Sequence, residues 1–156
     1  MQPRLDYRKA SPAALKAVQG LEEYLAHCSL EANLIHLLKM RASQINGCAY
    51  CIDMHSKDLR AAGETEQRIY ALDAWSETPF FSDRERAALA WTEAVTLVSH
   101  DHVPDDVFAE ARKNFNDNEL MDLTLAVATI NLWNRIAISF RAVPGHYKPA
   151  PQKVAV

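Results

Sequence analysis

Residues 43–55 of this 156-residue chain read Ser43-Gln-Ile-Asn-Gly-Cys48-Ala-Tyr-Cys51-Ile-Asp-Met-His55. Asn46-Gly47 is a typical helix stop, so the stretch predicts that one helix ends here and the next begins at about Cys48. Cys51 then lies one turn and His55 two turns after Cys48. At about 100° per residue the three side chains fall within an arc of roughly 60°. The pattern predicts two thiols and an imidazole on one helical face.

This face is suited to thiol redox chemistry. Free N–H groups and the positive end of the dipole at a helix start favour a thiolate, and they lower the pKa of a thiol from its usual value of about 8.5. His55 can accept or return the proton of Cys51. A disulfide closes easily and reversibly across the two residues between the cysteines. We therefore favour redox catalysis by Cys48 and Cys51.

Two other interpretations remain open. Cys48, Cys51, His55 and His36 could form a Cys2His2 zinc site, although no second close pair of ligands supports it. The two cysteines could also be buried residues without a chemical role. Against this, the preceding Asn-Gly pair indicates a helix start instead of a core segment. The third cysteine, Cys28, is interpreted as a small, half-buried residue.

Composition and charge narrow the class of protein. Apolar residues make up 49% of the chain and charged residues 24%, as in a soluble globular domain. A net charge of -3 with no basic stripe argues against a general nucleic-acid binder. Residues 1–9 hold no apolar signal core, so we expect a cytoplasmic protein, in which a close cysteine pair is catalytic or metal-binding instead of a structural disulfide.

The most apolar stretch, Leu120–Phe140, interrupts its hydrophobic run with polar groups, among them Asp122, Asn131 and Asn134. Such groups are too polar for a membrane span and suit a buried helix of a soluble protein. We therefore expect no membrane association.

Hydrophobic periodicity and helix-capping residues predict an all-α bundle of roughly six to seven helices. Ser11-Pro12 is a helix opening, and Ser82 with Glu85 and Asn116 with Glu119 form cap pairs. The predicted helices span residues 11–25, 31–45, 48–62, 64–74, 82–98, 104–113 and 116–140, with a loop at 76–79. We expect a single domain over 1–156, with its core at about 11–143 and a loosely ordered C-terminal tail at 144–156.

The segment Arg41–His55 closely resembles the core of the alkylhydroperoxidase D-like (AhpD-like) branch of the carboxymuconolactone decarboxylase family. The likeness continues through residues 62–64, 74–81 and 84–86 and through Asn131–Phe140, so it covers most of the chain. The resemblance implies an all-helical homo-oligomer, a trimer or hexamer. It also implies a peroxidase in which thiols reduce a hydroperoxide to an alcohol without a cofactor.

The resemblance also implies the roles of individual residues. Cys51 would be attacked by the peroxide and pass through a sulfenic acid, Cys48 would resolve it to a Cys48–Cys51 disulfide, and His55 would belong to the proton relay. A dithiol donor, such as a lipoyl-bearing adaptor protein, would reduce the disulfide. A dithiol–disulfide oxidoreductase or redox sensor is the alternative. Decarboxylation ranks lower, because decarboxylases of the family lack the cysteine pair.

The chain departs from the family pattern at one relay position. The usual glutamate, twelve residues before the first cysteine, corresponds here to His36. His36 can shuttle protons, since imidazole titrates near neutrality, and it can equally be a histidine packed beside Leu37 and Leu38. Glu31 and Glu93 are the nearest candidates for a substitute carboxylate.

Overall fold

The computed structural model describes residues 2–149, and within that range the chain is built from helices with no β-strand. The all-α prediction is confirmed. The α-helices are α1 (Tyr7–Ala10), α2 (Pro12–Leu25), α3 (Ala32–Ile45), α4 (Ala49–Ala61), α5 (Glu66–Ala71), α6 (Asp83–Thr96), α7 (Val98–Asp101), α8 (Asp105–Asn114) and α9 (Asp117–Phe140), and a 3₁₀ helix, η1, spans Leu72–Glu77.

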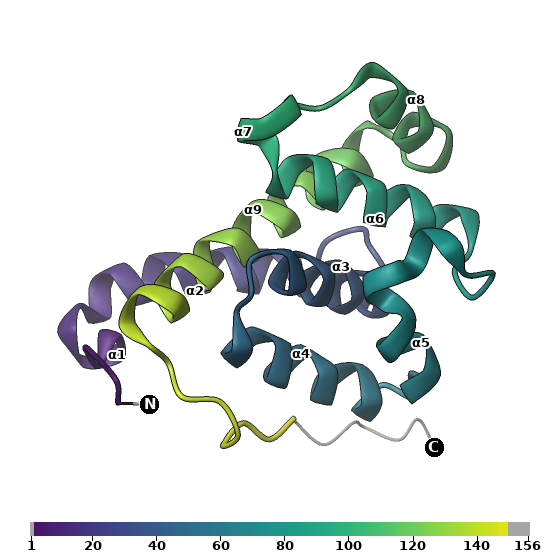
Figure 1. The fold of residues 1–156 in the computed structure, drawn as a ribbon. Coiled ribbons are helices and arrows are strands. Elements are labelled where there is room, and N and C mark those ends of the chain that lie inside the picture. The colour runs from purple at the N-terminus through teal and green to yellow at the C-terminus, as the bar shows by residue number, and fades with distance from the viewer. Residues whose placement is uncertain (1, 150–156) are drawn as a thin grey trace, which may run out of the picture.

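Helix α3 lies at the centre of the fold, with α4 on one side and α6 on the other (Figure 1). The long helix α9 crosses behind this layer and packs against α3, α6 and α2. The apolar residues Leu34, Leu37 and Leu38 of α3 are buried, and Ile45 at its end is half-buried. Helices α4 and α6 therefore cover α3, and α2, α6 and α8 cover α9, whereas α5 and α7 pack against α4 and α6.

The predicted helix starts at residues 11, 82 and 116 are confirmed by their caps. The Ser11 side chain accepts a hydrogen bond from the Ala14 amide. Ser82 with Glu85 and Asn116 with Glu119 form reciprocal capping boxes. Local side-chain chemistry fixes these starts, and so the sequence locates them well.

The structure contains more helical elements than the roughly six to seven expected. The short helices α1 and α7 were not predicted, because four-residue helices carry little periodicity. The predicted helix 64–74 is divided into α5 and η1, with a kink at Ala74, where φ is -117° and ψ is 33°. Because η1 continues to Glu77, the prediction of a loop over 76–79 is wrong for its first two residues.

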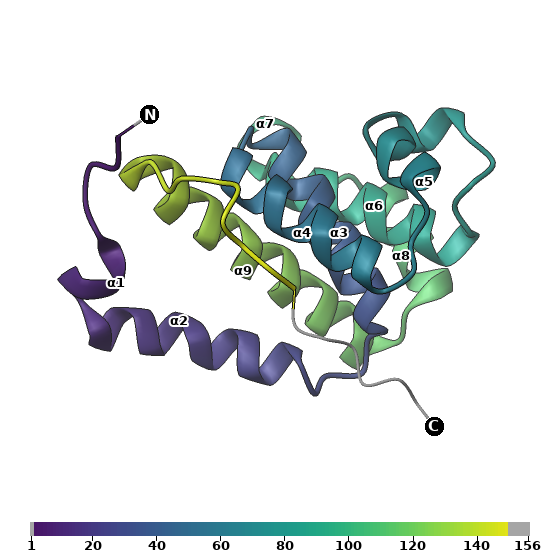
Figure 2. The ribbon, with the colours of Figure 1, turned by 90° about the horizontal axis from the view of Figure 1, so that it is seen from below.

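Helices α1 and α2 extend to one side and lie along α9 (Figure 2). Of the apolar residues of α2, only Leu25 is fully buried, and Leu15, Val18 and Leu21 are half-buried. Tyr7 of α1 stacks on Phe140 at the end of α9, with ring centroids 6.3 Å apart. The N-terminal segment is thereby held beside the C-terminal end of α9.

Helix α9 is long and apolar enough to cross a membrane, with a mean hydropathy of 1.3 over its most apolar window. Its buried face, however, carries Asp122, Asn131 and Asn134, each of which makes hydrogen bonds inside the protein. Buried polar groups with protein partners suit the core helix of a folded domain.

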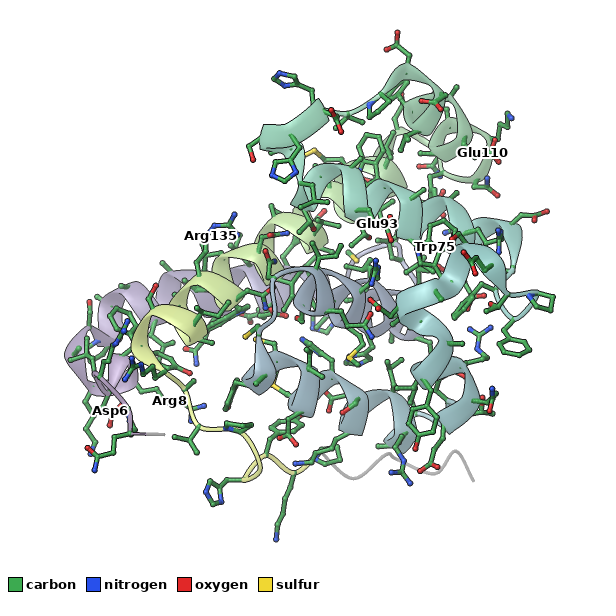
Figure 3. All side chains as sticks on the ribbon, in the orientation of Figure 1. Asp6, Arg8, Trp75, Glu93, Glu110 and Arg135 are labelled. Atoms are coloured by element: carbon green, nitrogen blue, oxygen red, sulfur yellow. The ribbon has the colours of Figure 1, made fainter. Side chains whose placement is uncertain are left out.

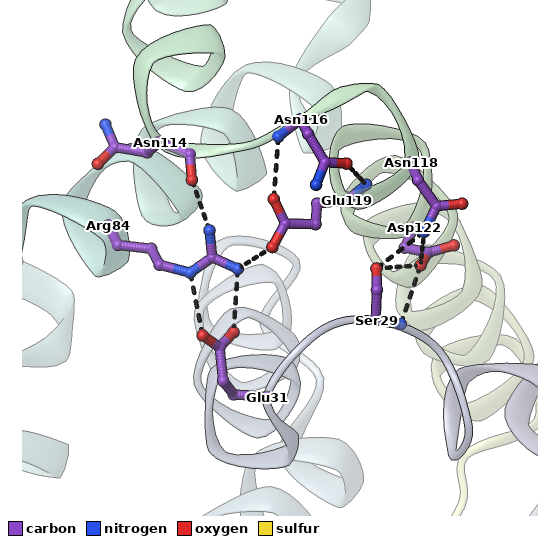
Figure 4. A network of polar contacts seen from close by, with 8 residues as sticks. All are labelled: Ser29, Glu31, Arg84, Asn114, Asn116, Asn118, Glu119 and Asp122. Carbon is purple, nitrogen blue, oxygen red and sulfur yellow. Dashed lines mark hydrogen bonds and ion pairs between the residues drawn. The ribbon is translucent and has the colours of Figure 1, made fainter.

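Two polar networks tie the 26–31 connection to α9 (Figure 4). Arg84 donates to both oxygens of Glu31, at 3.1 and 3.2 Å, and to Glu119 at 2.7 Å. Asp122, which is 2% exposed, accepts bonds from the Ser29 amide and hydroxyl and from the Tyr24 hydroxyl. Together they fix the position of α2 relative to α3.

Replacing Asp122 tests the second network. Asp122→Ala leaves several donors without an acceptor, and hydrogen bonds to a charged group contribute about 1.5–3 kcal/mol. We therefore expect the free energy of unfolding to fall by about 2–4 kcal/mol in denaturant titrations. Asp117→Ala is the matched control, because this carboxylate is 90% exposed on the same helix. It should change stability by less than about 1 kcal/mol. Equal losses in the two variants would contradict the assignment.

Candidate active site

The turn between α3 and α4 places the first cysteine. Gly47 has a φ of +66°, a conformation that favours glycine, and it ends α3 where the sequence predicts. The Cys48 amide then donates to the Ser43 carbonyl at 2.9 Å. Cys48 becomes the N-cap of α4, with extended backbone angles, so its side chain lies at the start of that helix as predicted.

The sulfur atoms of Cys48 and Cys51 are 3.1 Å apart, and their residues are 1% and 2% exposed. The hydrogen bond from the Cys51 thiol, together with the nearby amides of Cys51 and Tyr50, lowers the pKa of Cys48 to about 7 although burial opposes the shift. The same hydrogen bond, with burial, raises the pKa of Cys51. Near neutral pH about half of the Cys48 thiol is thus ionised, while Cys51 keeps its proton.

A buried amide supports the two sulfurs from α9. Asn134, which is fully buried, donates to the Ser43 hydroxyl at 3.1 Å and accepts from the Asn46 side chain at 2.8 Å. Hydrogen bonding from Asn134 also lowers the pKa of both thiols, although other effects are larger at each of them. Asn134 therefore links the helix stop before the cysteines to the sulfurs themselves.

A cavity of about 340 Å³ opens beside Cys51. Its walls come from segments far apart in the sequence, and Cys48 is not among the residues that line it. The residues that line the cavity are Tyr7, Arg8, Glu22, His36, Lys39, Tyr50, Cys51, Met54, His55, Asp58, Trp133, Ala137 and Tyr147. A small molecule in this cavity reaches Cys51, while Cys48 lies behind it.

His55 lies on the cavity wall, one turn after Cys51, and is 4% exposed. Burial lowers its pKa, although Asp58 opposes the shift. Its Nδ1 atom is 3.6 Å from Oδ2 of Asp58. Burial raises the pKa of Asp58, but the neighbouring His55 and the Tyr147 hydroxyl outweigh it and hold that pKa below its usual range. Asp58 is therefore an anion beside a neutral imidazole at neutral pH.

The structure places His36 in the same cluster. Its ring centroid is 6.0 Å from that of His55, and its Nδ1 is 4.0 Å from Oδ2 of Asp58. Burial and the neighbouring His55 lower the pKa of His36. Histidine therefore stands at the position of the expected relay glutamate and faces the same carboxylate as His55.

Neither carboxylate considered from the sequence lies at this cavity. Glu31 pairs with Arg84, and Glu93 accepts hydrogen bonds from Arg41 and from Trp75 at 2.8 and 2.7 Å. Figure 3 shows Glu93 and Trp75 together on the α6 side of the fold, away from α4. Both glutamates therefore form ion pairs or hydrogen bonds that join neighbouring elements.

The cavity residues missed from the sequence include Glu22, Lys39, Asp58 and Tyr147. Asp58 carries a local signal, since it follows His55 by three residues and shares its helical face. Glu22 and Lys39 form an ion pair of 2.5 Å between α2 and α3, and Trp133 of α9 donates to Glu22 at 2.9 Å. Only the tertiary fold brings this pair to the cavity.

Tyr147 lies in the tail that was expected to be loosely ordered. Within residues 144–149 the chain runs along α4 (Figures 1 and 2). Gly145 donates to Asp53 at 3.0 Å, Lys57 donates to the Tyr147 carbonyl at 3.2 Å, and the Tyr147 hydroxyl donates to Asp58 Oδ1 at 2.6 Å. This part of the tail forms one wall of the site; residues 150–156 lie outside the described range.

The Cys2His2 zinc set considered from the sequence is not the group that the fold assembles. Among residues 2–149, His36, His55 and Asp58 each present one potential ligand atom, with all three atoms within 4.8 Å of one another. Neither cysteine belongs to this group.

Comparison with known proteins identifies clear relatives. The sequence model of the carboxymuconolactone decarboxylase family matches residues 12–94. The chain is 42% identical over 139 residues to the uncharacterized protein YdfG of Bacillus subtilis, covering 89% of this chain and 95% of that protein.

Solved structures show the same fold. A protein of unknown function from Agrobacterium tumefaciens, described as a putative antioxidant defence protein AhpD, has 46% sequence identity and a TM-score of 0.91. That match covers 94% of this chain and all of the other. An uncharacterized peroxidase-related protein from Ralstonia eutropha, described as an alkylhydroperoxidase AhpD core, superposes with a TM-score of 0.78 at 22% identity over 89% and 74% of the two chains. At that identity the likeness concerns the fold alone.

The opposite shifts in the pKa values of Cys48 and Cys51 can be tested by titration. In Cys28→Ser protein, thiolate absorbance should rise with a midpoint at a pH of about 7, because the pKa of Cys48 is lowered to about 7. The second thiol should ionise only at alkaline pH. Adding Cys48→Ser should abolish the first step. Two thiols that titrate together near the ordinary value of about 8.5 would contradict the assignment.

Proposed function

Because the chain belongs to the AhpD-like branch of the carboxymuconolactone decarboxylase family, we propose that it is a thiol-dependent peroxidase that reduces hydroperoxides with Cys48 and Cys51. The observation that carries this proposal is the pair of sulfurs 3.1 Å apart, one of them on the wall of a cavity. A disulfide needs about 2.05 Å between its sulfurs, so closure requires a shift of only about 1 Å.

Cys51 is the sulfur that meets the peroxide, since it lines the cavity and Cys48 does not. Its proton passes to His55, whose imidazole lies one turn further along α4 and lines the same cavity. The Cys51 thiolate attacks one peroxide oxygen, the O–O bond breaks, and the departing alkoxide takes a proton and leaves as an alcohol. Cys51 becomes a sulfenic acid.

Cys48 completes the cycle. Its low pKa makes it a thiolate near neutrality, and it attacks the Cys51 sulfur and expels hydroxide, which takes up a proton and leaves as water. In sum, two thiols and one hydroperoxide give one disulfide, one alcohol and one water. The dithiol supplies both electrons.

The cluster behind His55 supports proton transfer. Asp58 is held by Tyr147 and turns its second oxygen toward His55 and His36. A carboxylate beside an imidazole orients the ring and stabilises its protonated form. Asp58 thus supplies the carboxylate that the family pattern places at the position of His36, and His36 extends the relay.

The cavity favours an organic hydroperoxide. Its volume of about 340 Å³ lies within the range of small-molecule sites, and Tyr7, Tyr50, Trp133 and Tyr147 give it aromatic walls. Hydrogen peroxide needs far less space and gains nothing from apolar walls. An aryl or alkyl group of the substrate would occupy the region between the α1 segment and Trp133.

The electron donor must be narrow enough to enter the cavity. Cys48 and Cys51 are at most 2% exposed, so a thiol fixed on a protein surface cannot readily reach either sulfur. A dithiol at the end of a flexible arm, such as the lipoyl group of an adaptor protein, can enter the cavity and attack Cys51. The trimeric or hexameric assembly and the cytoplasmic location expected from the sequence stay predictions.

A dithiol–disulfide oxidoreductase is the second candidate. It is favoured by the lowered pKa of the first cysteine of the pair, a property of such enzymes. It would reduce a protein disulfide with the same residues and form little alcohol from a peroxide. The burial of both sulfurs favours the small-molecule substrate.

The proposed cycle is tested in a single turnover. Mixing reduced protein with cumene hydroperoxide should consume two thiols per chain and release one cumyl alcohol. Cys51→Ser should form no alcohol, and Cys48→Ser should leave a sulfenic acid on Cys51 that dimedone traps. Cys28→Ser is the matched control and should behave as wild type. Survival of both thiols, or full turnover by Cys51→Ser, would refute the proposal.

The relay is tested by Asp58→Asn. Loss of the charge beside His55 should lower kcat/KM for the hydroperoxide about 10- to 100-fold, with dihydrolipoamide as donor. Glu31→Gln is the matched control, since this exposed glutamate pairs with Arg84 and should keep wild-type turnover. If Asp58→Asn is as active as Glu31→Gln, the carboxylate has no part in proton transfer.

A further inference from the structure

Three side chains that line the cavity bring potential metal-ligand atoms close together. His36 of α3 meets His55 and Asp58 of α4, and one donor atom from each lies within 4.8 Å of the others. The Nδ1 atoms of His55 and His36 are 3.6 and 4.0 Å from the same carboxylate oxygen, Oδ2 of Asp58.

These separations suit donors around a cation. A direct hydrogen bond between an imidazole N–H and a carboxylate brings the two atoms to about 2.7–2.9 Å. In a zinc site, where each ligand atom lies about 2.0–2.2 Å from the metal, tetrahedral neighbours are about 3.4 Å apart and cannot exceed about 4.2 Å. Both distances to Asp58 lie between the tetrahedral value and that limit. All three ligand atoms lie within 4.8 Å of one another, so a tetrahedral site needs the longest separation to shorten by at most about 1.4 Å.

The nitrogen atoms of the histidines are free to bind. Within residues 2–149, neither ring nitrogen of His55 has a hydrogen-bond partner, although the residue is only 4% exposed, and Nδ1 of His36 also lacks one. An unsatisfied buried polar group costs about 1–3 kcal/mol, so such groups are normally paired. A metal ion that accepts the nitrogen lone pairs removes that cost.

The carboxylate is oriented for the same purpose. Oδ1 of Asp58 accepts the Tyr147 hydroxyl at 2.6 Å, which leaves Oδ2 directed at both histidines. Partners of this kind, bonded to the far atom of a ligand, position it and strengthen metal binding. Of the two cations that line the cavity, Lys39 binds Glu22 at 2.5 Å and Arg8 donates to the Tyr50 hydroxyl at 3.1 Å, so within residues 2–149 neither pairs with Asp58. The negative charge of Asp58 is therefore left for a cation.

We propose that His36, His55 and Asp58 form a binding site for a divalent transition-metal ion. Among such ions, zinc fits this set of ligands best. Two imidazoles and one carboxylate with the fourth position open to the cavity match the preference of zinc for tetrahedral nitrogen and oxygen ligands. This proposal does not depend on the proposed peroxidase activity. If His55 binds zinc, its imidazole cannot transfer a proton at the same time. We therefore expect zinc to inhibit any reaction that uses this imidazole.

The test uses protein in which no thiol can bind the metal. In a Cys28→Ser, Cys48→Ser, Cys51→Ser background without an affinity tag, calorimetry should show one zinc ion bound per chain. Cobalt(II) should give the visible absorption of a four- or five-coordinate ion without thiolate charge transfer. His36→Ala, His55→Ala and Asp58→Asn should each weaken binding of both ions at least about ten-fold.

Controls separate the site from general effects. His100→Ala removes an exposed histidine outside the cavity and should bind zinc as the background protein does. Far-ultraviolet circular dichroism checks that each variant keeps its helices, and Asp58→Asn keeps the shape of the side chain. Absence of stoichiometric zinc binding, or unchanged binding in any of the three ligand variants, overturns the proposal. Because catalysis is not measured, a failure of the proposed function leaves this test intact.

Discussion

The position of the two sulfurs depends on the hydrogen bonds of one buried side-chain amide, that of Asn134. Asn134 lies on the long helix α9 with no exposed surface, and an amide left without partners there would cost about 1–3 kcal/mol for each unmade bond. Its partners are Asn46 and Ser43, at the end of α3. Because Gly47 and Cys48 follow at once, the same bonds that satisfy Asn134 place the start of α4 against α9. The thiol pair is thus a consequence of how a polar residue is accommodated in the core.

The second constraint is that the cavity beside Cys51 needs both ends of the described chain. Tyr7 and Arg8 come from α1, and Tyr147 comes from the segment after α9. The stacking of Tyr7 on Phe140 and the bonds from Gly145 and Tyr147 to α4 bring these ends together. Helices α3, α4 and α9 supply the reactive groups, and the terminal segments supply the walls. Substrate preference can therefore vary with the ends while the thiol chemistry stays fixed.

The features that could be predicted from the sequence are those decided by residues close together in the chain. The Asn-Gly stop, the caps at Ser82 and Asn116 and the common face of the cysteines are decided by neighbours within one or two turns, and the structure confirms them. Asp58 obeys the same local rule, since it follows His55 by one turn, whereas Glu31 and Glu93, the predicted substitute carboxylates, form packing contacts elsewhere. Glu22 and Tyr147 could not be found, since no periodicity relates α2 or the tail to α4.

The arrangement of the pair also explains why its two members are not equivalent. The residue with the lower pKa, Cys48, is shielded from the cavity, and the residue that faces the cavity, Cys51, holds the proton. A thiolate directly exposed to the cavity would react with any oxidant that enters. With the proton on Cys51, reaction requires that this proton be moved first, and His55 and Asp58 stand beside it for that purpose in the proposed cycle. Once Cys51 is oxidised, the waiting thiolate of Cys48 needs no further activation, so the sulfenic acid is consumed before a second peroxide can attack it.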